Sequence, residues 1–286
     1  MPSLIDIRRR IRSVKNMKQI TKAMKMVSAA KLRRAQDKVI AARPYAQSMQ
    51  RMLANIALAA KDEEISQIPL LAKREEKRIQ LIVVTADRGL AGAFNANVNR
   101  AGLKFLQEHR EADVALELVG RRGRDFFRKR HKNITGEYAT FFQKHVRYED
   151  ALEVAGKVIE RFEKAEIDAV YLVVNHFRNV VASDLSLTRI LPVELPENRT
   201  PIDYIYEQPP HALLRGLLPR YVQGQIYRAM LESAAAEHAA RMTAMDAATS
   251  NAGDVIDSLT LNMNRVRQAS ITREIIEIVS GAAALD

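Results

Sequence analysis

A hydrophobic repeat along the first sixty residues constrains the fold more than any other feature of the sequence. Apolar or small residues recur there at a mean step of 3.5, and only Thr21 and Ser28 among them are polar. This is the period of a left-handed coiled-coil seam. The sequence therefore predicts one helix about 85 Å long, capped by Ser3 and kinked or bent at Pro44. The predicted seam consists of Leu4, Ile7, Ile11, Val14, Met17, Thr21, Met24, Ser28, Leu32, Ala35, Val39, Ala42, Ala46, Met49, Leu53, Ile56 and Ala60.

The C-terminal region offers a partner for this helix. No proline follows Pro219 in the last 67 residues, and small or apolar residues again recur at steps of three and four. Pro219 suits the first turn of a second helix, where its missing N–H is tolerated. We therefore expect the two ends of the chain to form an antiparallel coiled coil. The expected second seam consists of Val222, Ile226, Ala229, Ser233, Ala236, Ala240, Thr243, Ala247 and Ser250, followed by Leu259, Met263, Val266 and Ile278.

Between the two helices, short apolar runs alternate with helical stretches. This alternation is typical of a small α/β domain with a mainly parallel sheet. We expect strands at 77–85, 113–120 and 168–175, helices at 95–110 and 148–165, and an extended stretch at 180–191. The predicted fold class mixes α+β and α/β: a long antiparallel two-helix coiled coil formed by the N- and C-terminal segments, with an inserted Rossmann-like α/β domain. The expected boundaries are 1–64 for the first helix, 65–212 for the α/β domain and its linkers, and 213–286 for the second helix.

The excess positive charge lies at one end of the chain. The formal net charge is +11, and residues 1–60 hold fourteen Lys or Arg against two acidic residues, Asp6 and Asp37. The rest of the chain is nearly neutral. Such a segment can meet nucleic acid, anionic lipid or an acidic protein surface, and charge alone does not separate the three. The density of positive charge from Arg8 to Lys25 exceeds what solubility requires, so we expect an acidic partner.

Composition and motifs argue against several classes of function. The chain has no Cys, no Trp and six scattered His without an HxxxH pair, which excludes disulfides and thiolate chemistry and argues against a metal site. We find no GxSxG or HExxH motif and no base beside a nucleophile, so we expect no catalytic residue and no cofactor. No apolar run reaches eighteen residues, and the charged start lacks a signal-peptide segment, so we expect no membrane insertion.

One glycine-containing turn lies where α/β folds bind phosphates. Residues 85–95 (TADRGLAGAFN) follow a predicted strand and precede a predicted helix. Their GxxG spacing is neither GxGxxG nor that of a P-loop. We therefore favour a tight strand-to-helix turn over a nucleotide site. A second basic group, at 121–124 and 128–130, is interpreted as a solvated face.

Four segments, taken in order, resemble the gamma subunit of the bacterial F-type ATP synthase. They are residues 3–36 (SLIDIRRRIRSVKNMKQITKAMKMVSAAKLRRAQ), 87–92 (DRGLAG), 237–245 (EHAARMTAM) and 269–284 (ASITREIIEIVSGAAA). The resemblance covers the whole chain in one register. It implies the fold that the periodicity also predicts, with an α/β domain beside a two-helix shaft.

The resemblance also implies a function. In that family the shaft turns inside a ring of three alpha and three beta subunits and forces each catalytic beta subunit through open and closed states. The proton-driven membrane c-ring turns the shaft, and the same coupling runs in reverse as ATP hydrolysis. The implied partners are the alpha, beta and epsilon subunits and the c-ring, with no nucleic acid. The implied role is non-catalytic and peripheral, on the cytoplasmic side of the cell membrane.

The contact residues are implied by the resemblance alone. The implied contacts with beta are Met24, Lys25, Arg241, Arg267 and Gln268. Lys25 stands where relatives often have Glu. The implied bearing tip, which turns in the sleeve at the top of the ring, contains Ile275, Ile278 and Leu285. The implied foot, which meets the membrane ring, contains Tyr204, Tyr206 and Glu207.

Two other functions stay open on the residues alone. A basic coiled coil could track the phosphates of nucleic acid, and a steep salt dependence of DNA affinity would indicate this. The turn at 85–95 by itself would fit a nucleotide-using α/β enzyme, whose melting temperature ATP or NAD should raise. We rank the rotor shaft first, nucleic-acid binding second and the enzyme third.

Overall fold

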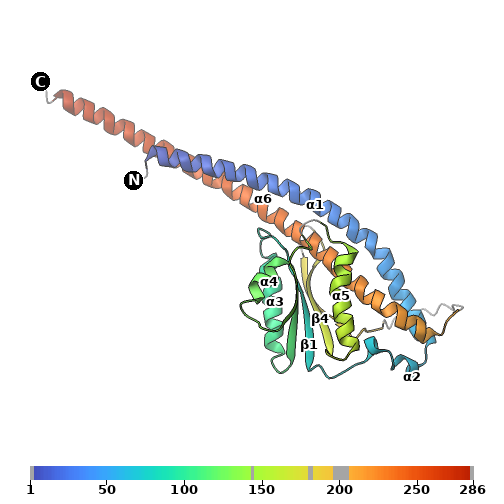
Figure 1. The fold of residues 1–286 in the computed structure, drawn as a ribbon. Helices are drawn as coiled ribbons and strands as arrows, with labels where there is room; N and C mark the ends of the chain where they lie inside the picture. The colour runs from blue at the N-terminus through green and yellow to red at the C-terminus, as the bar shows by residue number, and fades with distance from the viewer. Residues whose placement is uncertain (1–2, 143–144, 180–182, 196–205, 284–286) are drawn as a thin grey trace. The chain divides into compact units, whose positions relative to one another are not determined.

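The computed structural model describes residues 3–142, 145–179, 183–195 and 206–283. Two long helices, α1 (Leu4–Ala59) and α6 (Pro210–Ala283), flank all other elements in the sequence (Figure 1). Between them lie α2 (Asp62–Ile65), the 3-10 helix η1 (Pro69–Leu71), β1 (Arg78–Val84), α3 (Phe94–Glu108), β2 (Asp113–Val119), α4 (Arg121–Phe127), β3 (Ile134–Tyr138), α5 (Tyr148–Glu163), β4 (Ala169–Phe177) and β5 (Ser183–Leu191).

The chain divides into two compact units, and each long helix contributes to both. Unit 1 consists of Met1–Ser28 and Met242–Asp286, and unit 2 consists of Ala29–Arg241. From Leu4 onward, the described part of unit 1 is therefore helical, whereas unit 2 contains the sheet. The predicted mixed fold class is confirmed, with long terminal helices and an inserted α/β region.

Unit 2 is built on a five-stranded sheet of order β3-β2-β1-β4-β5. The pairs β1–β2, β1–β4 and β2–β3 are parallel, and only β5 runs antiparallel, against β4. Helices α3 and α4 lie on one side of the sheet and α5 on the other (Figure 1). Because helices cover both faces, β1 is buried along six of its seven residues. This explains the near-continuous apolar run of its sequence.

One core cluster of unit 2 lies between the sheet and the helices α3 and α4. Phe105 and Phe127 reach it from these helices, and both are at most 1% exposed. A second, small cluster joins the turn after β1 to α6, where Ala236 packs with Ala86 and Phe94. Within unit 2, α6 is thus apolar on more than one side, because it packs against the sheet region as well as forming its expected seam.

Unit 1 is an antiparallel pair of helices. Lys25 on α1 pairs with Asp246 on α6, and one turn towards the N-terminus of α1 the Thr249 hydroxyl donates to Thr21 Oγ1 at 2.8 Å. As residue numbers fall along α1, those of the partner on α6 rise. The predicted antiparallel arrangement of the two ends is confirmed in this unit.

The predicted seam of α1 is confirmed, with one exception. Ile7, Leu32, Val39 and Leu53 are all at most 5% exposed, but Met17 is 57% exposed. Two successive steps of three precede Met17 and rotate it out of the seam. Lys18 lies nearer to α6 instead, since a Cβ added to Gly253 would stand 3.0 Å from its Nζ.

The predicted seam of α6 is wrong in the first part of unit 1, whereas the expected positions Leu259, Met263 and Val266 are half-buried and fall in the seam. Thr243, Ala247 and Ser250 were expected in the seam, but all three are exposed. The inward positions are instead Met245, Thr249, Ala252 and Ile256, at alternating steps of four and three. Between Ala229 and Ala252 almost every residue is small or apolar, so the sequence pattern alone did not fix which stripe faces α1.

The ends of the long helices follow elementary capping chemistry. The Ser3 hydroxyl accepts from Asp6 N–H at 3.2 Å, and the Asp6 carboxylate accepts from Ser3 N–H at 3.4 Å, so the predicted N-cap is confirmed. Helix α1 continues through Pro44. The placement of Pro219 in a first turn is wrong, because α6 begins at Pro210 and contains Pro219 in its interior. Pro210 takes the initiating role instead.

Candidate functional site

The glycine-containing turn lies at the carboxyl end of β1, beside β2 and β4. In doubly wound sheets this is the switch point where ligands usually bind. Leu90 and Gly92 adopt positive φ values of 62° and 54°. The Asn95 side chain braces the turn, since its Oδ1 accepts from Ala86 N–H at 2.9 Å and its Nδ2 donates to the Arg88 carbonyl at 3.3 Å.

Two backbone donors near this turn are used by the chain itself. The Asp87 carboxylate accepts from the N–H groups of Arg121 and Phe142 at 2.9 and 3.0 Å. Arg121 is the first residue of α4, so a side-chain carboxylate sits near the helix N-terminus where a nucleotide fold would hold a phosphate. Burial raises the pKa of Asp87, although the two backbone donors oppose that shift. The arrangement therefore supports the tight-turn interpretation.

Arg241 reaches the same turn from α6. Its Nη2 donates to the Gly89 carbonyl at 3.1 Å and to Glu237 Oε1 at 2.6 Å. Arg241 is 9% exposed and Glu237 is 5% exposed. Desolvation raises the pKa of Glu237, and Arg241 opposes the shift. The guanidinium thus ties α6 to the turn within unit 2, and its implied contact with another subunit stays a prediction.

Sequence reasoning did not assign roles to Asp87, Glu237 or His238. Glu237 and Arg241 are four residues apart on a helix, which is the spacing of an ion pair and could have been read from the sequence. Asp87 carried no comparable signal, because its two partners come from distant parts of the chain. His238 is largely desolvated, and burial together with nearby cations lowers its pKa to about 4.

Unit 1 presents a cationic face on α1. Residues 1–28 hold eight Lys or Arg and one acidic residue, Asp6. Arg8, Arg9 and Arg10 are exposed, and of the unit 1 cations only Lys25 has an ion pair among the described residues, with Asp246 at 2.6 Å. That side chain is 40% exposed, so it stays accessible from solvent. The arrangement leaves a positive surface that a negatively charged partner could neutralise.

The implied beta contacts occupy two levels of unit 1. Met24 and Lys25 are half-buried beside the Asp246 level of α6, whereas Arg267 and Gln268 are exposed further along α6. The 21 residues that separate Asp246 from Arg267 span roughly 30 Å of helix. The structure therefore does not bring these two pairs together.

The end of α6 exposes large apolar side chains. Ile275 is 54% exposed and Ile278 is 71% exposed, and Ile271, Ile276 and Val279 are also exposed. In Figure 1 this segment extends beyond the start of α1 as a single helix. Leu285, the third implied tip residue, lies outside the described residues. An isolated helix with exposed isoleucines gains little stability from packing, so this surface is typical of one that a partner covers.

The implied foot is only partly described. Tyr206 is half-buried and its hydroxyl donates to the Asn55 carbonyl at 3.4 Å, while Glu207 is exposed. Tyr204 lies outside the described residues. Tyr206 therefore joins the start of the α6 region to the end of α1 within unit 2.

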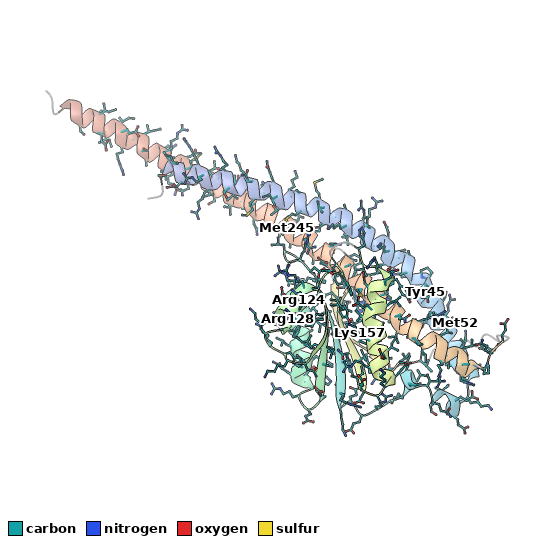
Figure 2. The ribbon with its side chains drawn as sticks, in the orientation of Figure 1. Tyr45, Met52, Arg124, Arg128, Lys157 and Met245 are labelled. Atoms are coloured by element: carbon teal, nitrogen blue, oxygen red, sulfur yellow. The ribbon has the colours of Figure 1, made fainter. Side chains whose placement is uncertain are left out.

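The second basic group lies on α4 and on the residues that directly follow it. Arg128 makes a two-pronged contact with Glu137 at 2.7 and 2.6 Å, and Arg124 pairs with Asp125 at 2.9 Å. Figure 2 shows Arg124 and Arg128 on the side of the sheet opposite Lys157. These pairs fit the interpretation of a solvated face.

Neither a metal cluster nor a membrane span is found within the described ranges. No group of three or more His, Asp or Glu among these residues could hold a metal ion. No helix in the described part of the chain is both long and apolar enough to cross a bilayer.

Comparisons with known proteins place the chain in a family. The ATP synthase family model matches residues 3–285. The chain is 61% identical over 287 aligned residues to the ATP synthase gamma chain of Solibacter usitatus, and 50% identical over 290 to that of an Anaeromyxobacter strain, with full coverage of both chains in each case. The protein class defined by the fold is a helical stalk subunit with an inserted α/β region. The chain belongs to the ATP synthase gamma chain family.

Solved structures agree with this assignment. A central-stalk chain of the Tetrahymena thermophila mitochondrial ATP synthase is 26% identical, with a TM-score of 0.62, and the match covers 80% of this chain and 99% of that one. A chain from the Euglena gracilis mitochondrial ATP synthase has a TM-score of 0.68 at 17% identity, covering 99% and 94%. The second likeness concerns the fold alone. Nothing in the comparisons favours nucleic-acid binding.

Proposed function

We propose that this chain is the central rotor shaft of an F-type ATP synthase. It couples rotation of a membrane c-ring to conformational cycling of catalytic beta subunits, and it makes and breaks no bonds itself. Its partners would be three alpha and three beta subunits, an epsilon subunit and the c-ring. It would lie on the cytoplasmic side of the cell membrane as a peripheral subunit, and influence both ATPase activity and proton flow.

The exposed apolar end of α6 carries this proposal. Ile275 and Ile278 stand on a helix that extends past its coiled-coil partner, and both are more than half exposed. An apolar sleeve would remove these side chains from water, at roughly 25 cal/mol per Å² of buried apolar surface. Contacts of this kind have no preferred direction. A helix end held in this way can therefore turn without a single orientation that traps it.

The asymmetry of unit 1 supports a coupling role. One helix is strongly cationic, whereas residues 242–286 of the other hold three basic and six acidic residues. A partner arranged around this pair would meet a different surface at each angle. Because a ligand shifts a conformational equilibrium only through differential contacts, such a surface can favour one conformation of a beta subunit at each rotor position.

Specific residues would make these contacts. Met24, Lys25, Arg267 and Gln268 lie on the unit 1 surface and would meet beta loops. Arg267 can offer a planar, two-pronged donor. Arg241, beside the turn at Gly89 in unit 2, would contribute a further contact with beta. Tyr206 and Glu207, with Tyr204, would form the foot on the membrane ring.

Reconstitution tests the proposal. The chain is co-expressed with alpha and beta subunits, and the purified material is examined by size exclusion with light scattering and by ATPase assay. We expect one copy of the chain per ring of three alpha and three beta subunits, with ATP hydrolysis in the complex and none in the free chain. A free chain that ignores the ring and binds DNA would overturn the proposal.

A matched pair of variants tests the contact residues. The double variant Arg267→Ala with Gln268→Ala should lower ATP synthesis in membrane vesicles while leaving part of the ATP hydrolysis intact. Arg265→Ala serves as the control, because Arg265 is an equally exposed cation two residues away on α6. Unchanged ATP synthesis in the double variant would remove both residues from the contact.

A further inference from the structure

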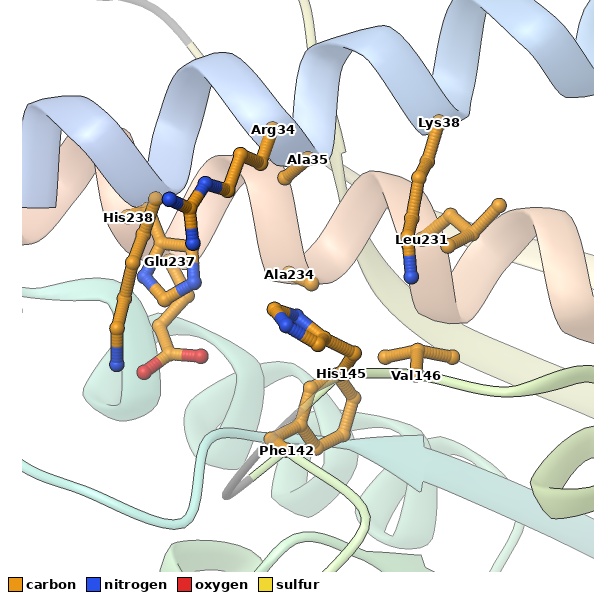
Figure 3. Close-up of a pocket in the computed structure, with 11 residues that line it drawn as sticks. Arg34, Ala35, Lys38, Phe142, His145, Val146, Leu231, Ala234, Glu237 and His238 are labelled. Atoms are coloured by element: carbon orange, nitrogen blue, oxygen red, sulfur yellow. The ribbon is translucent and has the colours of Figure 1, made fainter.

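A small hollow lies in unit 2 between α1, α6 and the segment before α5. Figure 3 shows Arg34 and Lys38 extending from α1 towards the side on which His145 lies, with Glu237 and His238 contributed by α6. Lys31 of α1 also lines it. The cavity measures about 40 Å³, which is room for roughly three water molecules on the usual measure of 10–15 Å³ each. The hollow is open to solvent, so its interior can hold one small polyatomic group while the rest of any larger ligand stays outside.

The charges around this hollow are unbalanced. Within the part of the chain that the structure describes, Lys31, Arg34 and Lys38 have no ion pair. The only carboxylate in the lining is Glu237, and it is engaged by Arg241 at 2.6 Å. Three exposed cations thus line the hollow against one carboxylate, which Arg241 already engages and on which Lys31 also acts. Mutual repulsion of this kind favours binding of an anion.

The lowered pKa of His238 reflects the same cationic surroundings, and its ring supplies a hydrogen-bond donor. Desolvation, followed by the nearby charges of Arg241, Lys31 and His145 in that order, lowers its pKa to about 4. The ring is therefore neutral at neutral pH. Its Nδ1 faces Arg241 Nη1 at 3.5 Å, a guanidinium that can only donate. The hydrogen of the neutral ring then belongs on Nε2, where it can be offered to a ligand.

We infer that this hollow binds a single phosphate group, as inorganic phosphate or as the terminal group of a phosphate ester. Phosphate carries between one and two negative charges near neutral pH and accepts several hydrogen bonds at once, which matches three cations better than one carboxylate would. The cavity is too small for a nucleoside, so any ester must leave the remainder of the molecule outside.

Bound phosphate would cross-link three elements of unit 2. Lys31, Arg34 and Lys38 belong to α1, His238 belongs to α6, and His145 belongs to the segment before α5. A ligand that binds only the folded arrangement stabilises it in proportion to the logarithm of its concentration. Bound phosphate would thus hold the unit 2 segments of α1 and α6 together more rigidly. This role goes beyond the proposed shaft function and does not depend on it.

Titration calorimetry on the full-length chain tests the site. Inorganic phosphate is added at constant ionic strength, and we expect saturable binding with one site per chain. Arg34→Gln and Lys38→Gln should each weaken the affinity about tenfold, since each removes one charge-assisted hydrogen bond. Arg33→Gln is the matched control, because Arg33 is an exposed neighbour outside the hollow, and it should change the affinity less than twofold.

Competing ligands distinguish the source of the phosphate. Equal affinity for inorganic phosphate and ATP would indicate that the group alone is recognised, whereas tighter binding of ATP with the same variant pattern would assign the site to an ester. Lysine acetylation, read by mass spectrometry, should show that phosphate protects Lys31 and Lys38 relative to Lys61. The absence of saturable heat would overturn the inference, and so would equal weakening of phosphate binding in all three variants. Either result would mean that phosphate responds only to the general positive charge of the chain.

Discussion

The two units of this chain bury apolar surface in different ways. In unit 2, Leu81, Leu116 and Phe162 are 0% exposed, and helices close the sheet on both faces. In unit 1, the helix pair buries a narrow seam, and the end of α6 leaves Ile278 71% exposed. Unit 2 therefore completes its core with its own residues. Unit 1 instead leaves apolar and cationic side chains exposed on its surface.

The two units also differ in whether their charged side chains are paired within the chain. The buried pair of Arg241 and Glu237 in unit 2 is satisfied within the chain, whereas most cations of α1 in unit 1 face solvent. Buried charges are costly when unpaired, and exposed ones cost little. Substitutions in unit 2 should therefore change the stability of the free chain, and substitutions on unit 1 should mainly change assembly.

The largest expected effect comes from breaking the buried ion pair. Arg241→Met would leave the Glu237 carboxylate buried without its partner, which costs about 3–5 kcal/mol of unfolding free energy. Urea denaturation of the full-length chain measures this. The double variant Arg241→Met with Glu237→Gln is the control and should recover much of the loss. Equal losses in the single and double variants would show that the charge is not what matters.

This variant also has a defined pH dependence. Burial raises the pKa of Glu237, so the folded chain holds this proton more tightly than the unfolded chain does. Stability then falls as pH rises from the unfolded pKa to the folded pKa. Without Arg241 the pKa rises further, so the fall extends to higher pH. The destabilisation of Arg241→Met should therefore be larger at alkaline than at mildly acidic pH.

A pair of truncations contrasts the two apolar surfaces. Leu116→Ala empties part of the closed core of unit 2 and should cost about 2–5 kcal/mol. Ile275→Ala removes an exposed side chain and should change the unfolding free energy of the free chain by less than about 0.5 kcal/mol. In the assembled complex, Ile275→Ala should weaken assembly or torque instead. A large loss of stability in the free Ile275→Ala chain would break the comparison.

A smaller effect is expected at His238. Its pKa is lowered to about 4 from 6.5, so the unfolded chain binds this proton first as pH falls. Stability present above pH 6.5 is therefore lost between pH 6.5 and about 4. His238→Gln should reduce the loss of stability over this interval by about 2 kcal/mol. Denaturant titrations at several pH values measure it, and parallel curves for the two proteins would contradict the assignment.

The smallest effects on stability are expected at two glycines, one in each unit. A Cβ at Gly156 of α5 would meet nothing within 4 Å, and a Cβ at Gly253 of α6 would meet only the mobile end of Lys18. Gly156→Ala and Gly253→Ala should each stabilise their helix by up to about 1 kcal/mol. Gly120→Ala is the contrasting control, because φ is +98° there and the Cβ would stand 2.1 Å from the Thr85 carbonyl. It should destabilise unit 2.

Much of the fold could be predicted because periodicity reports burial directly. The sixty-residue repeat predicted α1, and the alternation of apolar runs predicted β1, β2 and β4. Met17 fell outside the seam because the local steps shift the stripe. Thr243 was misplaced because α6 is rich in small residues on several sides. The short elements α4 and β3 were not predicted, since a basic segment and a five-residue strand carry little periodic signal.

The candidate site was less predictable for a physical reason. The Asp87 carboxylate bonds to backbone groups 34 and 55 residues away, and the hollow lined by Lys38, His145 and His238 is assembled from three separate elements. Sequence spacing does not encode such meetings. The contact residues on unit 1 came from family resemblance, and they stay predictions until the partners are present.

Hydrogen exchange measures the central contrast most directly. Amide exchange is followed by mass spectrometry for the free chain and for its complex with alpha and beta subunits, with β1 peptides as the internal reference. We expect the amides of residues 269–283 to exchange rapidly in the free chain and to be strongly protected in the complex, while β1 is protected in both. Equal exchange of residues 269–283 in the two states would contradict the account, because the apolar end of α6 would then have no sleeve around it.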